Sequence, residues 1–218
     1  MDYRNADGSL AEMCGNGIRV FARWLVEAGH AAARVAIPVA TRGGVRQVTV
    51  LGDGMVRVDM GVVRQPEVGK VFVETEHGRW PAAAAFAPNP HAVAFVSGLD
   101  EIGSLVAPPQ VISDGVFPDG VNVEFVVERT PRHLALRVHE RGSGETRSCG
   151  TGVCAVAAVA ARRVGVVGPS SWTIDVPGGR LTVDLDVSTA SAATAALTGP
   201  AVIVAAGEID HRWLAANA

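Results

Sequence analysis

Cysteine is scarce in this sequence, with three residues among 218. A small, odd number of cysteines does not make a disulfide framework, and two of the three stand in settings that favour a reactive thiol, so we expect a reducing compartment. The cysteines lie too far apart for a recognisable zinc pattern, and no ligand spacing appears among His30, His77, His133, His139 and His211. We therefore expect no metal site.

Long apolar runs and excess charge are also lacking. The longest apolar run, residues 153–161, is far shorter than the roughly 20 residues of a membrane-spanning helix, and residues 1–4 show no charged-then-apolar leader. The net charge of −3 gives no reason to expect nucleic acid or an anionic membrane as a partner. We expect a globular cytoplasmic protein with a small-molecule partner, and the sequence is compatible with a homodimer.

One short pattern is present twice, as Cys14-Gly15-Asn16-Gly17 and as Cys149-Gly150-Thr151-Gly152. Each copy leads into a predicted helix, the first with apolar residues at helical spacing and the second apolar on nearly every face, which predicts burial. A cysteine at a helix start meets unpaired N–H groups and the positive end of the helix dipole. We therefore expect a lowered thiol pKa, and the same N–H groups can bind a carboxylate.

A single such cysteine is more often a small buried hydrophobe than a reactive group. Two copies that share their glycines are hard to explain as packing twice over, and they predict one site with two thiols. Two thiols facing one carbon atom can invert a stereocentre, because one removes a proton while the other returns one. Fixed N–H dipoles would stabilise the carbanion, and no cofactor is needed. Cys154 lacks the glycine frame and is expected in the core.

Short strands are predicted between and after the two helices. Residues 45–51 and 55–60 alternate around a Gly-Asp-Gly turn and predict a hairpin, and residues 172–176 and 180–186 predict another. The remaining expected elements are strands at 70–75, 92–96, 121–127, 134–139 and about 195–206, a turn-rich connection at 80–88, and a short helix at 100–106.

The repeated motif predicts an α+β fold of two pseudo-symmetric halves. Each half would be a mixed or antiparallel sheet wrapped around a central helix, with the two helix N-termini facing each other across a cleft. We expect the first half to comprise residues 1–61 and 197–218, and the second half residues 62–196.

Further blocks accompany the two cysteine motifs, in a fixed order: Asn5-Ala6-Asp7-Gly8, Asn89-Pro90-His91, Val121-Asn122-Val123, Glu140-Arg141-Gly142 and Pro177-Gly178-Gly179. In these blocks the chain resembles the diaminopimelate epimerases. The resemblance implies a cofactor-independent isomerase with a two-base mechanism that interconverts LL- and meso-2,6-diaminopimelate, in lysine and cell-wall precursor biosynthesis. It also implies the two-halved fold.

The resemblance assigns roles residue by residue. Cys14 and Cys149 match the two acid–base thiols, and His91 and Glu140 match groups that tune them. Amide groups suit the fixed donors and acceptors of an amino acid, and arginine can clamp a carboxylate. The matched substrate-binding positions are Asn5, Gly15, Asn16, Asn89, Asn122, Glu140, Arg141, Gly150 and Thr151. One departure is Pro88, where the family usually has glycine, and it restricts the backbone before Asn89.

In the resembled family roughly seventy residues precede the Asn-Ala-Asp-Gly block, so we expect the first half to be truncated, with exposed strand edges. Two alternatives stay open. A proline or hydroxyproline racemase resembles this fold and also uses two cysteines, and a truncated, inactive remnant would act only as a binding or interaction module. The set of asparagines and the Glu-Arg-Gly block favour diaminopimelate.

Overall fold

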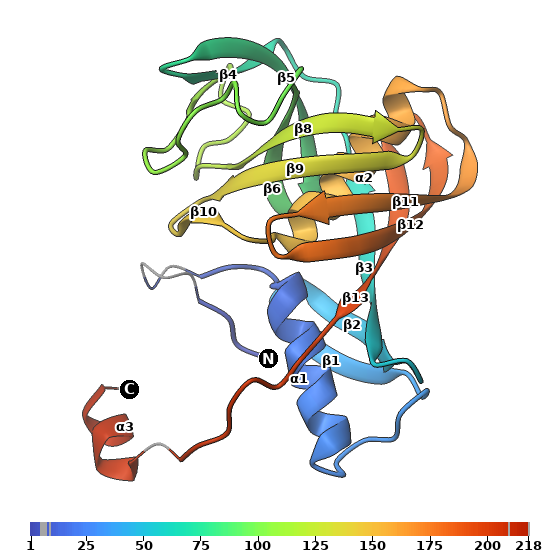
Figure 1. Cartoon of the computed structure of the whole chain (residues 1–218), viewed down its shortest axis with the longest axis vertical. Coiled ribbons are helices and arrows are strands. Elements are labelled where there is room, and N and C mark those ends of the chain that lie inside the picture. The colour runs from blue at the N-terminus through green and yellow to red at the C-terminus, as the bar shows by residue number, and fades with distance from the viewer. Residues whose placement is uncertain (5–7, 9, 209, 218) are drawn as a thin grey trace.

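A computed structural model describes residues 1–4, 8, 10–208 and 210–217 (Figure 1). Within these residues lie thirteen strands and three helices, α1 (Gly15–Glu27), α2 (Gly150–Arg163) and α3 (His211–Asn217). The strands are β1 (Ile37–Thr41), β2 (Gly44–Val50), β3 (Met55–Arg64), β4 (Val71–Thr75), β5 (Gly78–Ala87), β6 (Asn89–Phe95), β7 (Gln110–Ile112), β8 (Asn122–Thr130), β9 (His133–Glu140), β10 (Gly144–Thr146), β11 (Gly168–Val176), β12 (Gly179–Thr189) and β13 (Ala192–Pro200).

The strands form one mixed sheet that closes on itself. Hydrogen bonding runs in the order β1-β2-β3-β13-β12-β11-β9-β8-β6-β5-β4-β7, and β10 pairs with β9. A further pairing of Arg64 with Phe86 joins β3 to β5, so the strands from β3 to β5 along this order complete a barrel. The pairs β6–β8 and β9–β11 are parallel, and the other pairs are antiparallel. This arrangement confirms the predicted α+β class with a mixed sheet.

Helix α2 fills the barrel (Figure 1). Its first twelve residues, from Gly150 to Ala161, are all buried, as expected for a helix without a polar face. Nearly all of them are glycine, alanine or valine, and these small side chains allow strands to pack around the whole circumference. The predicted burial of this helix is confirmed, and Cys154 lies in the core at 0% exposure.

Helix α1 lies outside the barrel, against β2, β3 and β13. It buries Ile18 and Ala22 and leaves Trp24 47% exposed on the opposite side. Strands β1, β2 and β3 form the antiparallel meander on which it rests, and this meander contains the predicted Gly-Asp-Gly hairpin. The first helix is thus covered on one side only, whereas the second is enclosed.

Three predicted local structures differ from the observed ones. Residues 100–106 form turns, because the carbonyl groups of Leu99 and Gly103 accept hydrogen bonds from the Arg137 guanidinium and Gly103 has a φ of 70°. The expected turn-rich connection at 80–88 is largely strand β5, whose alanines pair with β6 in regular antiparallel register. The last strand ends at Pro200 rather than near residue 206.

Strand β13 lies between an early strand and a late strand of the sequence. It pairs along its length with both β3 and β12. Strand β3 in turn continues through Gly61 to Arg64, past the expected boundary after residue 61. The division into halves at these positions stays a prediction.

Among the described residues, no helix is both long and apolar enough to cross a membrane.

Candidate active site

The two motif cysteines occupy equivalent positions at the starts of two helices. Cys14 is the N-cap of α1, with φ −123° and ψ 109°, and Cys149 is the N-cap of α2, with φ −116° and ψ 111°. Each Sγ accepts a hydrogen bond from the N–H of the second motif glycine, at 3.2 Å from Gly17 and 3.4 Å from Gly152. The thiols thus occupy the usual place of an N-cap oxygen. This confirms the helix starts predicted from the repeated motif.

The first residues of the two helices touch each other. A Cβ atom on Gly15 would lie 2.8 Å from Gly150 Cα, and one on Gly150 would lie 2.6 Å from Gly15 Cα. Because Cβ atoms do not approach other atoms so closely, only glycine fits at both positions. A hydrogen bond of 2.6 Å from Asn16 Nδ2 to the Ser148 carbonyl group joins the same two turns.

A cavity of about 50 Å³ opens at this junction, and both thiols line it. It also collects most of the predicted substrate-binding residues: Gly15, Asn16, Asn89, Asn122, Glu140, Arg141, Gly150 and Thr151. Asn5 lies outside the described residues. Tyr3, Ala11, Met13 and Ser148 complete the lining, and no sequence pattern identified them beforehand. The cavity therefore joins the first residues of the chain with segments from its middle, between residues 89 and 151.

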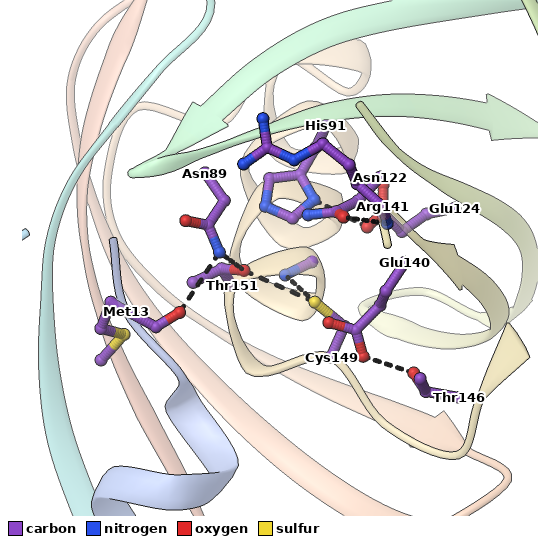
Figure 2. A network of polar contacts seen from close by, with 11 residues as sticks. Met13, Asn89, His91, Asn122, Glu124, Glu140, Arg141, Thr146, Cys149 and Thr151 are labelled. Atoms are coloured by element: carbon purple, nitrogen blue, oxygen red, sulfur yellow. Dashed lines mark hydrogen bonds and ion pairs between the residues drawn. The ribbon is translucent and has the colours of Figure 1, made fainter. Parts of the chain in front are cut away.

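The polar side chains of the cavity are held by short contacts (Figure 2). Asn89 Nδ2 donates to the Met13 carbonyl group and to Thr151 Oγ1, both at 3.3 Å, so it connects the two cysteine segments. Asn122 Oδ1 accepts a 2.9 Å bond from the backbone N–H of Arg141. The side-chain oxygen of Asn89, Oδ1, is buried and has no partner among the described residues, which leaves one acceptor available to a ligand.

The carboxylate and guanidinium at the end of β9 are also positioned by neighbours. Thr146 Oγ1 donates a hydrogen bond to Glu140. Arg141 Nη1 donates to the Asp119 carbonyl group at 2.9 Å, and Arg141 Nη2 lies 3.8 Å from a Glu12 carboxylate oxygen. Arg141 therefore carries a positive charge at the cavity wall, where it can attract a substrate carboxylate.

Behind the cavity wall lies a buried pair that the sequence did not reveal. His91 Nδ1 and Glu124 Oε1 are 2.7 Å apart, and both side chains have 0% exposure. Together with Cys149 they offer three ligand-type atoms within 4.8 Å of one another. His91 was predicted as a tuning group, whereas Glu124 was missed. The available signal was a glutamate inside the apolar strand Val121-Asn122-Val123-Glu124-Phe125.

Three such donors could hold a zinc ion in principle, since zinc accepts thiolate, imidazole and carboxylate ligands. The direct hydrogen bond between His91 and Glu124 already pairs two of these groups with each other. The absence of a metal ion stays a prediction.

The expected lowering of the thiol pKa is wrong for Cys149. Burial raises its pKa well above the usual range, and the Glu140 and Glu124 carboxylates act in the same direction. Hydrogen bonds from Thr151 and the Gly152 N–H oppose this shift but do not overcome it. The cost of burying a thiolate thus outweighs the helix N-terminus, and Cys149 is a neutral thiol at neutral pH.

Tyr3 is a second perturbed group at the cavity. Burial and the neighbouring Cys14 thiol raise its pKa to about 12, so it keeps its phenolic proton and can donate a hydrogen bond. The arrangement as a whole offers two thiols, two converging helix N-termini and a nearby guanidinium. Such a site can bind a carboxylate and exchange a proton on the adjacent carbon atom.

Comparison with known proteins places this geometry in a family. The family model for diaminopimelate epimerase matches residues 1–65 and 84–204. The diaminopimelate epimerase of Streptomyces coelicolor is 55% identical over 98% of this chain and 74% of its own length. That of Thermobifida fusca is 46% identical over 96% of this chain and 72% of its own length. These coverages do not say which part of either relative lies outside the match. The expected truncation of the first half is therefore not borne out.

Solved structures share the fold at low sequence identity. A probable proline racemase from Agrobacterium radiobacter has a TM-score of 0.73 at 16% identity, over 97% of this chain and 74% of that chain. A hydroxyproline epimerase from Agrobacterium vitis has a TM-score of 0.68 at 18% identity, over 88% of this chain and 66% of that chain. At this identity the likeness shows a common architecture and gives no information about the substrate.

Proposed function

The chain belongs to the diaminopimelate epimerase family, and we propose that Cys14 and Cys149 are the acid and base of its reaction. The protein is an isomerase that interconverts LL- and meso-2,6-diaminopimelate in lysine biosynthesis. The racemase and remnant alternatives are not favoured, since the relatives that match nearly the whole chain at high identity are diaminopimelate epimerases.

The observation that supports the proposal is the meeting of two cysteine-capped helices at one cavity. One thiolate removes the α-proton from one face of the substrate carbon, and the opposite thiol donates a proton to the other face. The substrate α-carboxylate lies at the helix N-termini, where the N–H groups stabilise the charge that develops beside it. Each thiol serves as the base for one isomer and as the acid for the other, so Cys149, which rests as a thiol, must lose its proton before it can act as the base.

Other lining groups hold the rest of the substrate in this proposal. Asn89 and Asn122 supply amide donors and acceptors, and Arg141 pairs with the distal carboxylate. Glu140 lies beside Cys149 and influences its protonation. We also propose that the enzyme works in the cytoplasm, without cofactor or nucleic acid, and that it can form homodimers.

Exchange of the diaminopimelate α-proton in heavy water, followed by NMR, tests the proposal. Inversion needs both faces of the carbon atom, so Cys14→Ala and Cys149→Ala should each abolish epimerisation. Cys154→Ala is the matched control, because Cys154 is buried in α2 and does not line the cavity. It should keep most of the activity. Substantial epimerisation by either of the first two variants would refute the two-thiol assignment.

A further inference from the structure

The two thiols have equivalent backbone geometry but different surroundings. Cys149 has the His91–Glu124 pair beside it. Gly152 allows this approach, because a Cβ atom there would lie 2.5 Å from Glu124 Oε1. At the corresponding glycine of the first motif, Gly17, the three nearest atoms that a Cβ atom would meet among the described residues belong to Cys14 and Met1, and none is a carboxylate oxygen. The absence of a side chain at Gly152 thus leaves room for the Glu124 carboxylate.

The hydrogen bond of the pair determines which ring nitrogen is free. His91 Nδ1 is 2.7 Å from Glu124 Oε1, and within the described residues Nε2 has no partner although it is buried. When an ionised carboxylate accepts from Nδ1–H, the proton stays on Nδ1 and Nε2 carries a lone pair. The same carboxylate stabilises the imidazolium that forms when Nε2 takes up a proton.

We propose that Glu124 is a positioning residue of the epimerase, which holds His91 so that its Nε2 takes the proton of the Cys149 thiol. This inference rests on the proposed role of Cys149. The S–H proton moves to Nε2, the thiolate and the imidazolium form together, and Glu124 balances the imidazolium charge. A proton later taken from substrate resides on Cys149 sulfur. Glu124 contacts neither substrate nor sulfur in this scheme.

Charges from other elements also surround Cys149. Glu140 and Arg141 lie at the end of β9, Cys14 lies at the start of α1, and Tyr3 belongs to the first residues of the chain. Glu140 and Glu124 both oppose the charged form of Cys149, so a thiolate there needs a nearby cation. Arg141 donates to the Asp119 carbonyl group, lies near Glu12 and is assigned to a substrate carboxylate, so the His91 imidazolium is the cation that can form next to this sulfur.

The test is the pH dependence of alkylation of each cysteine by iodoacetamide, read separately for Cys14 and Cys149 by peptide mass spectrometry. Glu124→Gln keeps an oxygen that accepts from Nδ1 but cannot balance an imidazolium. We expect the midpoint for Cys149 to rise by about one pH unit or more, which is about tenfold in thiolate at a fixed lower pH. The midpoint for Cys14 should not move, and kcat should fall with KM within about twofold.

Two controls distinguish this role from a structural one. Asp175→Asn alters a second His–carboxylate pair, His133 and Asp175 at 2.7 Å, neither of which lines the cavity, and it should change neither midpoint. In a His91→Gln background, Glu124→Gln should no longer raise the Cys149 midpoint, because only the direct repulsion between the Glu124 carboxylate and the thiolate is then removed. An unchanged or lower Cys149 midpoint in Glu124→Gln alone, an equal shift of both cysteines, or an equally large rise without His91 would overturn the proposal.

A measurement on the unaltered protein covers the case in which the variant does not fold. Nitrogen-15 NMR of the histidine rings should show His91 protonated at Nδ1 and bare at Nε2 near neutral pH, and the opposite tautomer would overturn the proposal. Both readouts are independent of turnover. If Cys149→Ala remained active, the two-thiol function would fail, whereas these measurements judge Glu124 alone.

Discussion

The contact between Gly15 and Gly150 makes Gly150→Ala the sharpest test of the two-helix site. The added Cβ atom would stand 2.6 Å from Gly15 Cα, whereas ordinary contacts begin at 3.4 Å. The helix starts must therefore separate by roughly 0.8 Å, the difference between these two distances, or tilt by an equivalent amount. The three nearest atoms all belong to the Gly15 backbone, so no side chain can rotate away.

The expected losses differ for stability and for catalysis. Overpacking of a rigid core costs about 1–3 kcal/mol, while alanine in a helix is itself about 1 kcal/mol more favourable than glycine, so a modest net destabilisation is expected. Catalysis should suffer more, because a misplacement of about 1 Å between reacting groups can cost about 100-fold in rate. We therefore expect a folded protein whose kcat is reduced by about two orders of magnitude.

The assay combines α-proton exchange of diaminopimelate with urea unfolding of the same sample. Gly98→Ala is the matched control, because a Cβ atom on Gly98 meets nothing within 4 Å and its φ is not left-handed. This variant should keep the activity of the unaltered protein. Wild-type kcat in Gly150→Ala would show that the closeness of the helix starts does not matter for the reaction.

Two other predictions use single residues of the cavity. Asn122→Ala leaves the Arg141 N–H without its buried acceptor and should lower the free energy of unfolding by about 1–3 kcal/mol, measurable by urea denaturation; an unchanged midpoint would mean that solvent replaces the amide. In the unaltered protein, alkylation of Cys149 should be slow at neutral pH and accelerate only under alkaline conditions, since burial raises its thiol pKa and the thiolate is lost as the pH falls. Rapid alkylation at neutral pH would contradict the raised pKa of the Cys149 thiol.

The sequence predicted the elements that have strong local signals. The two Cys-Gly-x-Gly motifs predicted both helix starts, and Gly-Asp-Gly and Pro-Gly-Gly predicted the hairpins β2–β3 and β11–β12. Residues 82–85, all alanine, carried no strand signal, and their pairing with β6 comes from the barrel. The expected helix at 100–106 was wrong because Arg137, from a distant strand, binds the carbonyl groups of that segment.

The candidate site was predicted in the same uneven way. Residues in recognisable motifs, such as Cys14, Asn89 and Arg141, line the cavity as expected. Glu124 was missed because a single glutamate in a strand gives no pattern until folding brings His91 and Cys149 beside it. The acidity of Cys149 was misjudged because the helix position is visible in sequence, whereas complete burial depends on the whole barrel.

The pairing of β3 with β13 also sets the order in which this protein can fold. Arg64 pairs with Ala192, 128 residues later, so during synthesis the edge of β3 waits for nearly the whole chain. Ribosomes add about 5–20 residues per second, and β3 therefore remains unpaired on this side for several seconds or more. Contacts this distant in sequence slow folding, and an open strand edge can pair with another chain. The N-terminal part of the nascent chain therefore cannot complete its sheet before the C-terminal part is made. The meander β1–β3 is the segment that a chaperone would have the longest time to bind.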